Sequence, residues 1–321
     1  MTGRRKRMSG LHSVHGSSRT AANNLLDCRD CSARIRDVSL IRIVILAIVQ
    51  GLAELLPISS SAHVVVAEKL LGLDPSSPPM TLLLVMLHTG TMLAVIVYFW
   101  KRWKNTYFQN TAHLKGFTQL AAVATILTAV TGEIFIKLIE NTLFRNAPHA
   151  EIEDLFSHLE IIAPALAVAG LLILVAGIVE KRHSHGTEVN LRQACVIGAV
   201  QGLCLCFRGF SRSGATISTG MLAGVAKAPA ENFSFALAVI LTPPVVGREI
   251  LRLVHGHRDG LANGLSSAIY SGLLGAVFAF IAGLIALRWL SHLLEAGRWY
   301  LFGIYCLVAA VIVETLHFYG Y

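Results

Sequence analysis

The sequence predicts an all-α integral membrane protein: an inverted repeat of two halves, each a re-entrant helical hairpin followed by three transmembrane helices. Three observations lead to this prediction. Only 14% of the residues are charged, whereas a soluble domain usually carries about 25%. Apolar runs of about 20 residues, the length that crosses a bilayer, recur along the chain. The tetrapeptide VQGL stands at 49–52 and again at 200–203, which indicates an internal duplication.

The N-terminal segment differs in composition from the rest, and we expect residues 1–39 to form a basic, disordered tail on a membrane domain at 40–321. Residues 1–36 hold eight Lys or Arg against two Asp, a net +6 of the chain's +8. Because the positive charge is concentrated in the tail, the high pI does not indicate a nucleic-acid-binding domain. We also expect no signal peptide, since the basic leader is too long and no small-residue cleavage site follows the first apolar run.

The tail contains two pairs of residues that have the spacing of zinc ligands. No helix or strand signal surrounds them, so disorder is the favoured interpretation. The pairs are His12-x-x-His15 and Cys28-x-x-Cys31.

Six apolar segments are predicted to cross the membrane, because each reaches the roughly 20 residues that a spanning helix needs. One of them includes Pro243-Pro244 and spans only if the helix continues past these prolines with a kink. The six segments are 80–100, 118–139, 161–179, 233–254, 267–287 and 299–319.

Two further pairs of apolar segments are too short to span singly, and a Ser-rich turn joins the members of each pair. We therefore predict two re-entrant hairpins. The offset of 151 residues that relates the two VQGL sequences also carries Ser60 onto Ser211. The hairpins are 40–56 with 61–73 and 194–207 with 214–226, and the repeat halves are about 40–180 and 190–321.

The number of spans between the hairpins predicts that the two halves are inverted. Three spans separate the hairpins, so the second hairpin enters the membrane from the opposite face. Non-helical backbone at membrane depth must be buried in protein or line a wet cavity, and inverted repeats place such a cavity near the midplane. We therefore expect the two Ser-rich turns to face each other.

The charges of the loops predict the orientation. The loops at 101–117 and 180–192 are basic and share one side, whereas the loop at 140–160 on the other side is acidic. The positive-inside rule then makes the basic loops cytoplasmic and both termini external. The basic tail argues for the reverse, and we give the loops more weight.

The first hairpin carries ionisable residues at membrane depth. Gln50 and Glu54 are four residues apart and so share one helix face. Pro57 ends that helix, and Ser60 follows at the start of the next. His63 lies about one turn further on, so its imidazole can reach the Ser60 hydroxyl as a base reaches a nucleophile. The alternative is a helix cap with a packed histidine, but an ionisable side chain in a membrane segment favours function.

The second hairpin contains RGFSRSGATIS at 208–218, a Gly- and Ser-rich helix start of the kind that binds phosphate. The guanidinium of Arg212 is a planar fork suited to bidentate phosphate contact. The alternative is an arginine that extends to the lipid headgroups. In the spanning segment 80–100, His88 is as compatible with lining the cavity as with packing.

Taken together, QGLAELLPISSSAH and GFSRSGATISTGML resemble the two signature motifs of the bacterial undecaprenyl-diphosphate phosphatase family, of the bacitracin-resistance type. The resemblance covers roughly residues 40–320. It implies a multi-pass enzyme of the bacterial cell membrane that hydrolyses undecaprenyl diphosphate to undecaprenyl phosphate and inorganic phosphate, recycling the cell-wall lipid carrier. It also implies a site that faces the periplasm, a divalent cation (Mg²⁺ or Ca²⁺) and a homodimer.

The resemblance implies a role for each matching residue. Glu54 matches a catalytic and metal-binding glutamate, Ser60 the candidate nucleophile and His63 an essential histidine, while Arg212 matches the phosphate-binding arginine. Substrate-binding roles fall on the neighbouring polar residues of the two motifs, which are Gln50, Ser59, Ser211, Ser213 and Thr216.

Two positions depart from the family pattern. Gln50 stands where the family has a glutamate, which leaves one fewer carboxylate for Mg²⁺ or Ca²⁺, cations that prefer oxygen ligands. Arg208 stands where the family has proline and adds a cation beside the site.

In the mechanism that these roles imply, Ser60 is activated by His63 and attacks the terminal phosphorus while Arg212 holds the phosphate. Attack by water, or by His63 itself, is an open alternative. Two other functions are also open: a transporter or flippase for an anionic lipid, because transporters share this architecture, and a phosphatase relative with an altered substrate.

Overall fold

The computed structural model describes residues 39–73, 77–143, 159–179, 188–256 and 265–319. The regular elements of these segments are all helices. The predictions for the tail, including both candidate zinc pairs, lie outside the described residues, as does most of the acidic loop.

Six helices in the described segments are long and apolar enough to cross a membrane. They correspond to the six predicted spans, and the helix that includes Pro243 and Pro244 continues through both prolines. The spanning helices are α4 (Pro78–Thr106), α5 (Thr111–Leu143), α7 (Leu159–Val179), α10 (Lys227–Gly256), α11 (Leu265–Glu295) and α12 (Tyr300–Phe318).

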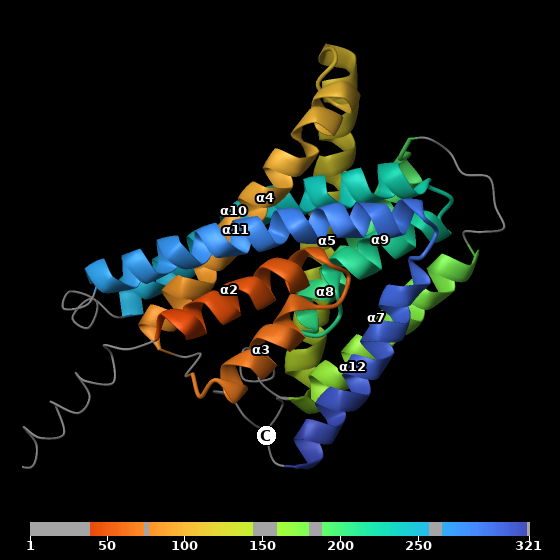
Figure 1. The fold of residues 1–321 in the computed structure, drawn as a ribbon. Helices are drawn as coiled ribbons and strands as arrows, with labels where there is room; N and C mark the ends of the chain where they lie inside the picture. The colour runs from red at the N-terminus through yellow and green to blue at the C-terminus, as the bar shows by residue number, and fades with distance from the viewer. Residues whose placement is uncertain (1–38, 74–76, 144–158, 180–187, 257–264, 320–321) are drawn as a thin grey trace, which may run out of the picture. The chain divides into compact units, whose positions relative to one another are not determined.

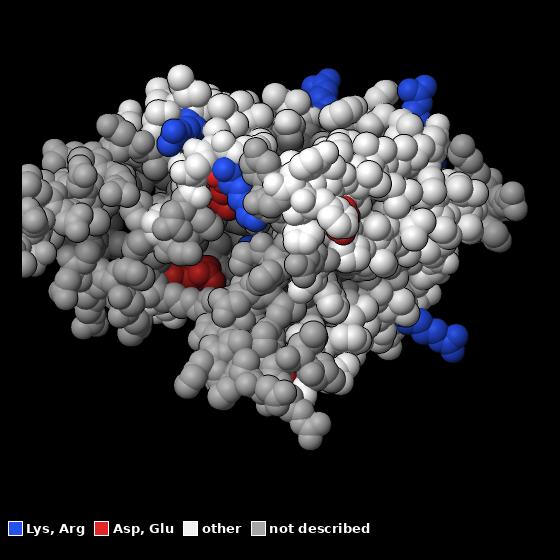
Figure 2. Space-filling model, turned by 90° about the horizontal axis from the view of Figure 1, so that it is seen from below, with Lys and Arg blue, Asp and Glu red and all other residues white. Residues whose placement is uncertain are grey.

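The outward faces of these helices are suited to lipid. Ile126, Ile285 and Val311 are 61%, 60% and 67% exposed, which is unfavourable in water but not in a bilayer. On the face that Figure 2 shows, most of the described surface is neither acidic nor basic. The chain is therefore an all-α, multi-pass membrane protein, as predicted.

The two predicted hairpins are present as pairs of short helices. In each pair the first helix has 16 residues and the second has 11, or roughly 24 and 16 Å at 1.5 Å per residue. Neither length crosses a hydrocarbon core of about 30 Å. The first hairpin is α2 (Leu40–Leu55) with α3 (Ser60–Leu70), and the second is α8 (Leu191–Cys206) with α9 (Arg212–Leu222).

The same order of helices, a short pair followed by three long helices, occurs in both halves of the chain. The first hairpin helix of each half packs against a long helix of the other half. The hairpin helix α2 packs against α11 of the second half, while its counterpart α8 packs against α5 of the first half. The last helices of the halves, α7 and α12, lie side by side (Figure 1). These pairings agree with the predicted duplication, and the inversion of the halves across the membrane stays a prediction.

The glycine of VQGL makes the exchanged contact possible in both halves. A Cβ on Gly51 would lie 2.7 Å from the backbone oxygen of Ala279 in α11, and a Cβ on Gly202 would lie 2.6 Å from that of Thr128 in α5. Both distances are shorter than side chains tolerate, so only glycine lets these backbones approach. The two contacts are related by the same offset of 151 residues: Gly51 corresponds to Gly202, and Thr128 corresponds to Ala279.

Candidate active site

The site is built around Glu54, which lies in the last turn of α2. Its carboxylate is 13% exposed and contacts groups from three elements. Oε1 accepts a hydrogen bond from Nη2 of Arg212 at 2.7 Å, and Oε2 accepts one from the Ser60 hydroxyl at 2.5 Å. Nε2 of Gln50 donates to Oε2 at 3.2 Å, and Nε2 of His88 lies 3.7 Å from it. The fold thus brings together residues that are up to 158 positions apart in the sequence.

The two Ser-rich turns face each other, as predicted. The hydroxyl of Ser213 donates to the backbone oxygen of Leu56 at 3.3 Å, and the backbone N–H of Gly209 donates to the hydroxyl of Ser61 at 3.2 Å. Gly209 has a φ of 98°, a conformation that favours glycine. These bonds between the hairpins set Arg212, the first residue of α9, beside Glu54.

Three predicted substrate-binding hydroxyls contact protein groups. Ser211 caps α9 by accepting from the backbone N–H of Gly214 at 3.3 Å. Thr216 is buried, donates to the backbone oxygen of Arg212 at 2.8 Å and lies 2.5 Å from the hydroxyl of Ser234. Ser59 is buried as well and lies 3.2 Å from the hydroxyl of Ser61. In this arrangement they shape the turns, and substrate contact by these residues stays a prediction.

The expected hydrogen bond between His63 and Ser60 is not the one that the structure shows. The Ser60 hydroxyl donates to Glu54. Nδ1 of His63 lies 2.8 Å from the backbone oxygen of Ser59, and Nε2 lies 2.8 Å from the hydroxyl of Tyr305. Although the spacing of three residues is correct for one helix face, Ser60 is the first residue of α3 and its side chain turns back toward α2. Sequence proximity therefore pointed to the wrong partner.

Both ring nitrogens of His63 have hydrogen-bond partners. A carbonyl only accepts, so Nδ1 carries a hydrogen toward the Ser59 oxygen. The rings of His63 and Tyr305 also stack, with centroids 5.7 Å apart. His63 therefore holds the Ser59 carbonyl in a turn where Ser59 has a φ of 68°.

We expect His63→Asn to retain at least tenfold more activity than His63→Ala. The Asn amide nitrogen reproduces the position of Nδ1 and can still donate to the Ser59 carbonyl, whereas Ala cannot. The measurement is kcat and KM for phosphate release at several pH values. Equal loss in the two variants would instead show that Nε2 is essential, as a base or nucleophile must be.

A small hollow adjoins Glu54 on the side of α4 and α10. It is lined by polar groups of Glu54, His88 and Arg212, and by two threonines, Thr91 and Thr242. Apolar side chains complete its wall: Leu55, Met92, Val95, Phe235, Ala238 and Val239. The sequence pointed to Glu54, His88 and Arg212 but not to the two threonines of the hollow. It also did not point to Tyr305, which contacts His63, since single polar residues in spanning segments form no motif.

Arg208 interacts electrostatically with the carboxylate of Glu68 in α3. Arg208 thus interacts with the first hairpin at Glu68, and Arg212 is the arginine that contacts Glu54.

The donors around Glu54 do not fit a divalent cation in this arrangement. Mg²⁺ and Ca²⁺ require about six oxygen ligands. One carboxylate oxygen of Glu54 is bonded to the Arg212 guanidinium, and Gln50 presents its N–H to the other. In the part of the chain that the structure describes, no three His, Cys, Asp or Glu residues form a metal-binding group. We therefore derive no step through a metal, and the predicted cation stays a prediction.

Comparison with known proteins shows the family. Residues 43–312 match the family described as bacitracin resistance protein BacA. The chain belongs to this family. The match covers nearly all of the two hairpins and of the six spanning helices, so the Glu54 site lies within the matched region.

Several known proteins are similar to this chain over almost their whole length. Undecaprenyl-diphosphatase 2 of Acinetobacter baylyi is 52% identical over 282 residues, which is 87% of this chain and 98% of that protein. Undecaprenyl-diphosphatases of Desulforapulum autotrophicum and Korarchaeum cryptofilum are 33% and 32% identical, over 84% and 85% of this chain and 95% and 97% of their own lengths.

Proposed function

We propose that this BacA-family protein is a membrane phosphatase that hydrolyses undecaprenyl diphosphate to undecaprenyl phosphate and inorganic phosphate. This reaction recycles the lipid carrier of cell-wall synthesis and confers resistance to bacitracin. The names of the relatives support the substrate. The observation that carries the proposal is the meeting of Arg212, Glu54 and Ser60, a phosphate-binding cation, a carboxylate and a hydroxyl, at the contact of the two hairpins.

The lipid tail stays in the bilayer while the diphosphate enters beside Glu54. Arg212 uses one N–H on Glu54, and its side chain is 27% exposed, which leaves donors for the terminal phosphate. Because Arg212 is already held by Glu54, its position requires little reorganisation when negative charge develops in the transition state. His88 lines the same hollow, with Nε2 3.7 Å from Oε2 of Glu54.

The geometry favours Glu54 over His63 as the base. The Ser60 hydroxyl already donates to Glu54 at 2.5 Å, within the distance that proton transfer requires. Ser60 Oγ attacks the terminal phosphorus, its proton passes to Glu54, and the bond from phosphorus to the bridging oxygen breaks, releasing undecaprenyl phosphate. Water then attacks the phosphoserine, which regenerates Ser60 and releases inorganic phosphate.

The decisive assay is the release of inorganic phosphate from undecaprenyl diphosphate by the purified protein in detergent. We expect release by the natural sequence and none above background by Glu54→Ala. Absence of release by the natural sequence, together with movement of the lipid between leaflets of proteoliposomes, would support a transporter instead.

The presence of Gln50 in place of a glutamate leads to a prediction about the dependence of activity on divalent cations. We expect a chelator to change the activity of the natural sequence by less than about threefold, because Glu54 is paired with Arg212. Gln50→Glu places a second carboxylate four residues before Glu54, and we expect its activity to rise on addition of Mg²⁺ or Ca²⁺. If the chelator abolishes activity of the natural sequence and Mg²⁺ restores it, the predicted cation is needed despite the glutamine.

We further propose that the site faces the periplasm and that the protein forms a homodimer. The basic loop at 101–117 supports this orientation, and the family resemblance supports the dimer. Labelling of a single cysteine placed in the loop at 140–160, in otherwise cysteine-free protein, tests the orientation in intact cells. Light scattering of the purified protein tests the dimer.

A further inference from the structure

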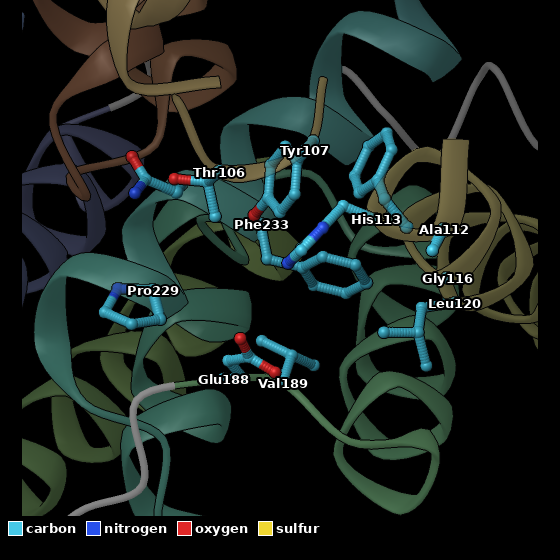
Figure 3. Close-up of a pocket in the computed structure, with 12 residues that line it drawn as sticks. Thr106, Tyr107, Ala112, His113, Gly116, Leu120, Glu188, Val189, Pro229 and Phe233 are labelled. Carbon is cyan, nitrogen blue, oxygen red and sulfur yellow. The ribbon is translucent and has the colours of Figure 1, made fainter. Parts of the chain in front are cut away.

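A cavity of about 450 Å³ lies apart from the active site. It is an open cavity lined by the end of α4, the beginnings of α5 and α10, and the segment that precedes α8 (Figure 3). Tyr107, which lines it, follows His88 by 19 residues along α4, or roughly 28 Å of helix. The cavity is thus distinct from the hollow beside Glu54, and the proposed phosphatase reaction does not use it.

One side of the cavity is aromatic. The rings of Tyr107 and Phe117 stack with centroids 4.1 Å apart, and Phe233 meets Phe117 edge to face at 6.5 Å. In Figure 3, Tyr107, His113 and Phe233 lie together on this side, and Glu188 lies with Val189 on the opposite side. Aromatic faces carry partial negative charge and attract cations.

The cavity presents hydrogen-bond acceptors beside the hydroxyls of Thr106 and Tyr107, which can donate or accept. Oδ1 of Asn110 accepts from the backbone N–H of His113 at 3.0 Å and lies 2.9 Å from the ring Nδ1. Nδ1 therefore carries a hydrogen toward Asn110. The carboxylate of Glu188 accepts as well. Oδ1 of Asn232, another lining residue, is buried and has no hydrogen-bond partner within the described residues.

The charge of the lining decides the class of ligand. Of the lining residues, Glu188 carries a full charge and none is Lys or Arg. A phosphate or carboxylate inside the cavity would meet the Glu188 carboxylate without a lysine or arginine among the lining residues, which is unfavourable. The phosphate of a zwitterionic lipid would therefore have to stay outside. A ligand that carries a positive charge and N–H donors satisfies the acceptors and the aromatic faces together.

We propose that this cavity binds an organic primary ammonium ion. Its position at the ends of the spanning helices α4, α5 and α10 places it at the level of the lipid headgroups. The ammonium group can therefore come from a membrane lipid, as in phosphatidylethanolamine, or from a free amine. Both sources present the same chemistry to Glu188 and the aromatic rings.

Calorimetric titration of the purified protein in detergent tests the proposal. The probes are dihexanoyl-phosphatidylethanolamine, dihexanoyl-phosphatidylglycerol with the same acyl chains but no ammonium, and ethanolamine. We expect saturable binding of the phosphatidylethanolamine that Glu188→Gln weakens at least tenfold. Glu140→Gln, a matched change at an exposed position near the far end of α5, should leave binding unchanged. Ethanolamine binding of similar strength would identify the ammonium group alone as the ligand, and its absence would identify the lipid headgroup.

Three outcomes would overturn the proposal: no saturable binding of either amine, equal binding of the phosphatidylglycerol, or binding that Glu188→Gln leaves unchanged. Phosphate release by Glu188→Gln at the level of the natural sequence shows that the variant is folded. Phe117→Leu provides a second variant that preserves apolar volume but removes an aromatic face, and we expect it to weaken binding as well.

Discussion

Replacement of Arg212 with Ala is expected to lower kcat/KM for undecaprenyl diphosphate by about a thousandfold. Two losses contribute. The guanidinium no longer neutralises charge on the transferred phosphoryl group, and Glu54 loses the partner that its Oε1 contacts at 2.7 Å. Arg212→Lys keeps the positive charge but not the planar fork, so we expect an intermediate loss of about ten- to a hundredfold. The measurement is phosphate release over a range of substrate concentrations.

Arg208→Gln is the matched control for this prediction. It removes the same charge four residues away, in the same turn, but Arg208 acts on Glu68 rather than on Glu54. We expect its effect to stay below tenfold. A loss as large as that of Arg212→Ala would mean that the general positive potential of the turn matters, and not the specific contact with phosphate.

Replacement of Ser60 with Ala is the second change with a large expected effect, a loss of about a thousandfold or more in kcat. Ala removes the hydroxyl that donates to Glu54 and with it the proposed nucleophile. Rapid acid quenching of the natural sequence with labelled substrate should trap a phosphoserine at this position. Ser61→Ala is the control, because the Ser61 hydroxyl contacts Ser59 and the backbone of Gly209 rather than Glu54.

Near-full activity of Ser60→Ala, combined with loss of activity in His63→Ala, would disprove the serine mechanism. In that case water or His63 attacks the phosphorus. Loss of activity in Ser60→Ala without a trapped phosphoserine would favour water that Ser60 and Glu54 orient together.

Much of the fold could be predicted because a bilayer restricts the choices strongly. A backbone in lipid must satisfy its own hydrogen bonds, so long apolar runs become helices, and their bounds are close to those predicted. The facing hairpins could also be predicted, since Pro57 interrupts the first hairpin and the repeat of VQGL relates it to the second.

The partners within the site could be predicted less well. Tyr305 contacts His63 from 242 residues away, and no local pattern distinguishes it from other tyrosines of an apolar helix. The hydrogen-bond partner of Ser60 is set by the direction of its own side chain at the start of α3, which sequence does not reveal. The second cavity combines Tyr107 after α4, Phe117 near the start of α5 and Phe233 near the start of α10. Only the packing of distant segments produces this combination.

The exchange of α2 and α8 between the halves has a consequence for biosynthesis. The packing partner of α2 is α11, which begins 210 residues after α2 ends; at about 5–20 residues per second this delay is roughly 10–40 s. During that time α2, with Gly51 and Glu54, is already part of the nascent protein, but the α11 backbone that packs against Gly51 has not been synthesised. Its counterpart α8 finds α5 already made. Assembly is therefore ordered in time: α8 can pack against α5 as soon as it is synthesised, whereas α2 can pack against α11 only after α11 has been synthesised.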